Sequence, residues 1–109
     1  MVSGIFIPIL EVALLIVVAV SEKCIEVNGH AGYAEHGKDI VCAGVSVLTQ
    51  NLINSIKAFT DDVISYEVAP AQIHINYENL SEQSKLLIDS FFIGVCEIQR
   101  AYPKYVQII

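Results

Sequence analysis

The sequence has few charged residues, and its basic side chains are scattered singly. Of its 109 residues only 17% are charged, and six Lys and Arg against twelve Asp and Glu give a formal net charge of -6. A protein that binds nucleic acid needs clustered Lys and Arg to neutralise phosphates. The sequence therefore predicts no direct contact with nucleic acid, and it favours a protein as the binding partner.

Cysteine is also sparse, and its spacing excludes two common kinds of site. Cys24, Cys42 and Cys96 are odd in number and form no CxxC pair, so neither a disulfide framework nor a thiolate zinc site is predicted. A zinc site made from Cys24 and Cys42 with His30 and His36 would match no common ligand spacing. We therefore expect no metal, no cofactor and a reducing, cytoplasmic environment.

The longest apolar run, residues 5–20, lacks the marks of an export signal or a membrane anchor. No Lys or Arg precedes it, Pro8 and Glu11 interrupt it, and its length falls short of the roughly 20 residues that span a bilayer. Residues 9–20 are rich in Val, Ile and Leu without a helical period, which is typical of a buried strand. We expect no membrane association.

What the sequence does have is apolar residues, which make up 54% of the chain and are enough for one core at this length. Residues 1–109 are therefore expected to form a single domain. Periodicity and turn residues predict, in order, strands at 9–20 and 24–27, a helix at 40–59, strands at 63–68 and 72–77, a helix from Ser81 that Pro103 stops, and a possible last strand at 105–109.

This order of elements predicts an α+β fold. Two helices packed on one face of a mainly antiparallel sheet would bury the apolar stripes of both layers. The expected architecture is therefore a two-layer single domain.

Cys42 is the candidate nucleophile because of its place at the start of the first helix. Asp39 is a favoured N-cap residue that can accept from the backbone N–H of Val41 or Cys42, which puts Cys42 in the first turn. The free N–H groups and dipole of a helix start lower the pKa of a thiol. The charge of Asp39 opposes thiolate formation, so we expect Asp39 to act by geometry or by orienting a histidine.

A nucleophilic thiol needs a base, and histidine suits that role at neutral pH. His30 and His36 are both candidates; His30, at the end of a predicted strand, is preferred over His36, which lies within a glycine-containing loop. The alternative is that Cys42 is a small buried hydrophobe, which is common near helix starts. His74, Cys24 and Cys96 are expected to have structural roles.

Two short segments resemble a known family. Residues 29–34, with the order Gly-His-Ala-Gly-Tyr-Ala, and residues 37–43, with Gly-Lys-Asp-Ile-Val-Cys-Ala, are followed one turn later by Ser46. In this order they resemble the ribosomal-processing cysteine proteases, the Prp family, and the likeness extends over roughly residues 22–109. The opening segment, to about residue 19, is longer and more apolar than the family's first strand, which leaves open a dimer strand, a misassigned start codon or a targeting segment.

The resemblance implies a specific function. Family members remove a short N-terminal extension from the precursor of a bacterial large-subunit ribosomal protein, the twenty-seventh of its series, and they form homodimers. It implies that His30 and Cys42 are the catalytic pair and that Gly29, Asp39 and Ser46 accompany them. We expect acyl transfer through Cys42, with backbone N–H groups at the helix start stabilising the oxyanion.

Two rival interpretations stay open. The first is a non-catalytic binding or assembly factor for a ribosomal protein, which would use the same groove without turnover. The second is a small structural α+β domain whose thiol only packs.

Overall fold

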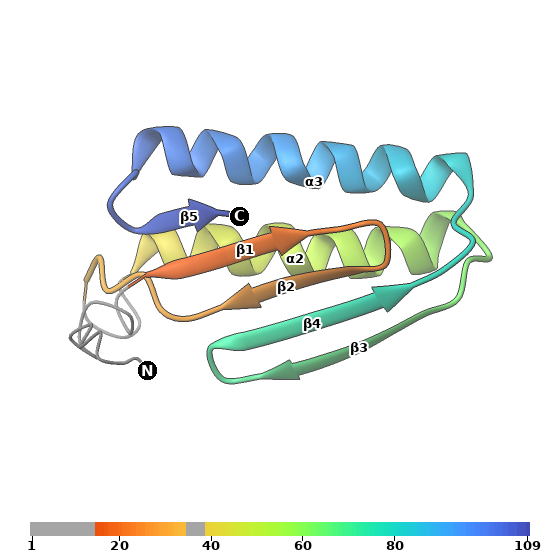
Figure 1. Ribbon diagram of the computed structural model, residues 1–109, viewed down its shortest axis with the longest axis horizontal. Helices are drawn as coiled ribbons and strands as arrows, with labels where there is room; N and C mark the ends of the chain where they lie inside the picture. Colours follow the sequence, from red (N-terminus) through yellow and green to blue (C-terminus); the bar gives the residue numbers. More distant parts are fainter. Residues whose placement is uncertain (1–14, 35–38) are drawn as a thin grey trace.

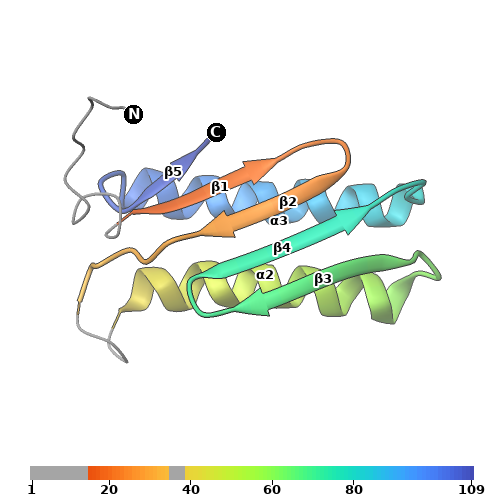
Figure 2. The ribbon, with the colours of Figure 1, turned by 60° about the horizontal axis from the view of Figure 1, so that its bottom comes forward.

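The computed structural model describes residues 15–34 and 39–109, which form a five-stranded sheet and two long helices. Both helices lie on the same face of the sheet and run side by side (Figures 1 and 2). The predicted α+β architecture of two helices on a mainly antiparallel sheet is confirmed. The elements are β1 (Ile16–Val20), β2 (Cys24–Asn28), α2 (Ile40–Phe59), β3 (Ile64–Ala69), β4 (Gln72–Tyr77), α3 (Glu82–Ala101) and β5 (Val106–Ile108).

The strands lie in the order β3-β4-β2-β1-β5, and only the β1–β5 pair is parallel. Consecutive predicted strands pair as two antiparallel hairpins, β1–β2 and β3–β4, and the possible last strand at the C-terminus is confirmed as β5. Residues 9–14 of the predicted first strand lie outside the described residues, and β1 begins at Ile16. Because β4 pairs with β2, the turn of the β3–β4 hairpin lies beside the end of β2.

The helices cover the sheet with continuous apolar stripes. The buried face of α2 includes Val41, Val45 and Ile53, which join Ile25 and Ile75 of the sheet in one core. This helix has the predicted bounds, and Asp39 is its N-cap, as expected. Ser81 caps α3, which ends before Pro103, also as predicted. Of the helices in the described parts of the chain, none combines the length and apolarity needed to cross a membrane.

His74 lies away from the helices, because its neighbours Ile73 and Ile75 point into the core and side chains alternate along a strand. Its ring Nδ1 is 3.1 Å from a carboxylate oxygen of Glu26, and its Nε2 is 3.0 Å from the amide oxygen of Asn76. These contacts agree with the structural role expected for His74.

Gly29 is the point at which the chain turns out of the sheet toward α2. Its φ is 101°, a value that L side chains rarely adopt, and its N–H donates to the carbonyl of Ala71 at 2.8 Å. A Cβ at this position would fall on the backbone carbonyl oxygen of Leu15, far inside contact distance. The backbone geometry therefore requires glycine here.

Replacing Gly29 by alanine is expected to lower the free energy of unfolding by about 2–4 kcal/mol, because strain and a backbone clash add together. Chemical denaturation measures the change. Gly44→Ala is the matched control: a Cβ there meets only the flexible end of Ile98, at 3.2 Å, and a helix interior favours alanine over glycine by about 1 kcal/mol. Equal losses in the two variants would show that Gly29 has no special backbone role.

Candidate active site

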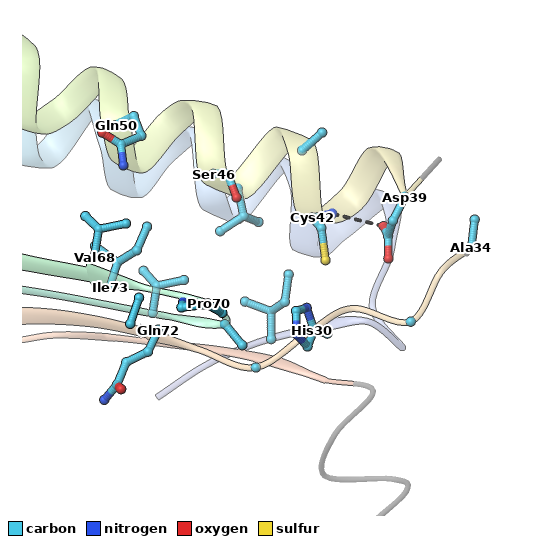
Figure 3. Close-up of a pocket in the computed structure, with 18 residues that line it drawn as sticks. His30, Ala34, Asp39, Cys42, Ser46, Gln50, Val68, Pro70, Gln72 and Ile73 are labelled. Atoms are coloured by element: carbon cyan, nitrogen blue, oxygen red, sulfur yellow. Dashed lines mark hydrogen bonds between the residues drawn. The ribbon is translucent and has the colours of Figure 1, made fainter. Parts of the chain in front are cut away.

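A groove of about 680 Å³ lies between the first half of α2 and the strands beneath it (Figure 3). Its walls come from the segment after β2, from one face of α2 and from the turn of the β3–β4 hairpin. Segments far apart in the sequence therefore meet at one cavity. The predicted site residues all line it: Gly29, His30, Asp39, Cys42 and Ser46.

Cys42 places its thiol in this groove from the first turn of α2 (Figure 3). The Sγ atom accepts a hydrogen bond from the backbone N–H of Ala31 at 3.2 Å. Burial raises the pKa of the Cys42 thiol; the Ala31 N–H lowers this pKa, and the charge of Asp39 raises it further. The net pKa is above its ordinary value. This direction is opposite to the lowering predicted from the helix start, because burial and Asp39 outweigh the backbone hydrogen bonds that lower the pKa.

Asp39 joins the segment after β2 to the start of α2. One carboxylate oxygen accepts from the N–H groups of Val41 and Cys42 at 3.0 Å each, and the other accepts from the N–H of Tyr33 at 3.0 Å. Burial raises the pKa of Asp39, but the hydrogen bonds from Cys42 and Tyr33 outweigh it and hold the pKa below its usual range. Of the two roles expected for Asp39, the contacts support the geometric one.

His30 stands two residues beyond β2, exposed to solvent. Figure 3 shows its ring on the wall of the groove that faces Cys42. Among the described residues no hydrogen bond joins His30 to Cys42, so a proton transfer between them needs a closer approach. His36, the other candidate base, lies outside the described residues.

Ser46 and Gln50 follow Cys42 at successive turns along the same wall (Figure 3). The opposite wall is formed by Val68, Pro70 and Ile73 near the hairpin turn. Sequence reasoning missed Gln50, although its four-residue spacing from Ser46 was a usable signal. It also missed the hairpin residues and the Ala31 N–H, which no sequence motif marks.

No three His, Cys, Asp or Glu side chains in residues 15–34 and 39–109 are placed to hold a metal ion. The chemistry that the groove offers is that of a thiol and an imidazole. Cys24 and Cys96, the other cysteines, are both half-buried and free.

Replacing Asp39 by asparagine is expected to lower the pKa of the Cys42 thiol, because the carboxylate charge that raises it is lost. Asparagine caps helices as well as aspartate does, so α2 keeps its start, while its NH2 group cannot accept the hydrogen bond from the N–H of Tyr33. The rate of Cys42 alkylation by iodoacetamide near neutral pH should rise about three- to tenfold, since the thiolate is the reacting form. Mass spectrometry of the Cys42 peptide measures it; an unchanged or slower rate would contradict this electrostatic role.

A thiol on the first turn of a helix, facing a histidine across an open groove, is the arrangement of a cysteine-dependent hydrolase. The sequence model of the family described as cysteine protease Prp matches residues 16–107. The chain belongs to this family, and it is a cysteine protease of the ribosomal-processing type.

Individual relatives agree with this assignment. The chain is 26% identical over 84 residues to the ribosomal processing cysteine protease Prp of Staphylococcus aureus, covering 74% of this chain and 79% of that protein. The Bacillus subtilis protein of the same name is also 26% identical over 84 residues, with 71% and 75% covered.

Solved structures show the same fold. The S. aureus Prp protease, in complex with a covalently linked product peptide, matches with a TM-score of 0.78 at 21% identity, covering 86% of this chain and 95% of that one. A Streptococcus mutans protein matches with a TM-score of 0.74 at 27% identity, covering 86% and 91%.

Proposed function

We propose that this protease removes the short N-terminal extension from the precursor of a large-subunit ribosomal protein, the twenty-seventh of its series, with Cys42 as nucleophile and His30 as general base and acid. The observation that carries the proposal is that Cys42 and His30 face each other across one groove (Figure 3). The S. aureus relative has been solved with a substrate peptide, at a TM-score of 0.74 and 20% identity. That relative supports a peptide as the occupant of the groove.

The proposed reaction is acyl transfer in two halves. His30 takes the thiol proton, and the thiolate of Cys42 attacks the scissile carbonyl carbon, so that a C–S bond forms and an electron pair moves onto the oxygen. When this intermediate collapses, the C–N bond breaks and His30 protonates the leaving amine. Water, deprotonated by His30, then attacks the thioester, and the peptide carboxylate and the Cys42 thiol are released.

The groove and the surface charge fit the proposed substrate. Val68, Pro70 and Ile73 give the groove an apolar wall. The family resemblance implies an extension that ends in paired aromatic residues before a small residue, and such a wall suits these aromatic side chains. The net charge of -6 favours encounter with a basic ribosomal precursor.

We further propose that the protein acts in the cytoplasm as a homodimer. Val47, Leu86 and Ile93 are exposed apolar side chains on the helical layer, which would tolerate a contact with a second copy. Light scattering of the purified chain measures its mass, and a monomeric mass at micromolar concentration would contradict the dimer.

Cleavage of a synthetic peptide tests the proposed function. The peptide spans the extension and the first residues of the mature ribosomal protein, and mass spectrometry identifies the products. Cutting at the end of the extension is expected with the natural chain and with Cys96→Ala, a control that changes another half-buried cysteine. A peptide that binds but stays intact would instead favour the binding or assembly factor.

A further inference from the structure

At the start of α2, the N–H groups of Val41 and Cys42 are not free to bind an oxyanion. The N–H groups of Val41 and Cys42 both donate to the same carboxylate oxygen of Asp39, at 3.0 Å each. Because a capped N–H is not available to a second acceptor in good geometry, the expectation that the helix start stabilises the oxyanion is not supported. Ile40, the first residue of α2, does not line the groove, so the donors are sought in another part of it.

The turn after β2 directs a backbone N–H, that of Ala31, at the nucleophile. The N–H of Ala31 donates to the Sγ of Cys42 at 3.2 Å, and Ala31 itself is completely buried. Positive φ values at Gly29 (101°) and Gly32 (65°) shape this turn. Turns that include left-handed residues can point successive N–H groups into one concavity, which is a common form of anion site. Gly32, the next residue, also lines the groove beside Cys42, and its backbone lowers the pKa of the thiol.

We propose that the backbone N–H groups of Ala31 and Gly32 form the oxyanion hole of this protease. The assignment rests on the proposed role of Cys42 as nucleophile. The attacked carbonyl carbon becomes bonded to Sγ, so its oxygen lies next to the sulfur, within reach of the N–H that the sulfur occupies in the free protein. The donors would thus pass from the thiolate to the oxyanion as charge moves from sulfur to oxygen.

This placement puts the proposed base and the proposed donors side by side in the chain. His30 directly precedes Ala31 and Gly32, so the base and both donors lie on three consecutive residues. Asp39 fixes the same segment through the N–H of Tyr33. Asp39 is therefore a positioning residue for the oxyanion donors as well as the cap of α2.

Removing one N–H without changing the side chain tests the assignment. In a chain with lactic acid in place of Ala31, an ester oxygen replaces the N–H. Two probes are then compared at Cys42: p-nitrophenyl acetate, whose acetyl group transfers to the thiolate through an oxyanion, and iodoacetamide, which loses iodide without forming one. The ratio of acetylation rate to alkylation rate should fall tenfold or more. Because both probes need the thiolate, a change in its pKa cancels in the ratio.

The matched control is lactic acid in place of Ala34, further along the same segment, with an expected ratio within about twofold of the natural chain. Parallel loss of both rates in the Ala31 ester, or no loss, would overturn the proposal. Neither probe depends on the ribosomal substrate, so failure here is distinct from failure to cleave the precursor peptide.

A second measurement uses the natural chain, so it tests the assignment even if the ester variant does not fold. An aldehyde such as N-acetyl-phenylalaninal adds to Cys42 and leaves an oxygen where the oxyanion would lie, whereas methyl methanethiosulfonate leaves only an S-methyl group. In NMR spectra of ¹⁵N-labelled protein, the amide protons of Ala31 and Gly32 should shift downfield in the aldehyde adduct. They should not shift downfield in the methylthio adduct. Equal responses to the two adducts would contradict the assignment.

Discussion

Replacing Cys42 by alanine is expected to lower kcat/KM for cleavage of the precursor peptide by at least about 10³-fold, because the reaction loses the atom that forms the acyl bond. Cys42 is half-buried beside the core, so alanine fits its place and the groove keeps its walls. Peptide binding, measured by fluorescence anisotropy, should stay within about threefold of the natural chain. Binding without turnover separates loss of chemistry from loss of fold.

Cys24→Ala is the control for this result, since Cys24 lies on β2 and does not line the groove. That variant should keep its cleavage rate. If Cys42→Ala cleaved at the natural rate, or if Cys24→Ala alone abolished cleavage, Cys42 would not be the nucleophile.

Replacing His30 by alanine is expected to lower kcat by about 10²–10⁴-fold, the range for loss of a general base and acid. His30 is exposed, so the change should leave the free energy of unfolding within about 0.5 kcal/mol. Steady-state cleavage assays across pH measure the effect. His30→Gln should be similarly impaired, because glutamine keeps a polar side chain but does not take up a proton at neutral pH.

His74→Ala is the matched control, since His74 is held by Glu26 and Asn76 on the sheet, away from the groove. Its kcat should be unchanged. Full activity of the His30 variants would show that another group acts as the base.

Local sequence was enough to predict α2 and its cap. Apolar residues recur at helical spacing from Ile40 to Ile56, and Asp39 precedes them, so the bounds and the hydrogen bonds to Val41 and Cys42 follow from neighbours in the chain. The short strands were also predicted from local sequence, by their β-branched residues and the turn residues between them. The motif residues around His30 and Cys42 also lie close in sequence, and they meet at one groove.

The parts that could not be predicted depend on contacts between distant segments. The hairpin turn near Pro70 lies by the groove because β4 pairs with β2, an order that strand patterns do not specify. The direction of the Cys42 pKa shift was predicted wrongly because burial arises from tertiary packing. The donor at Ala31 is a backbone N–H, which every residue except proline has, so the residue type does not reveal it.

The most direct test of the central claim is to trap the acyl-enzyme. The protease is mixed with the precursor peptide, quenched in acid within milliseconds to seconds, digested and analysed by mass spectrometry. The peptide containing Cys42 is expected to gain the mass of the acyl group of the extension, bound as a thioester, and His30→Ala should greatly reduce the formation of this adduct. Cleavage without any adduct, or an adduct on Cys24 or Cys96, would contradict it.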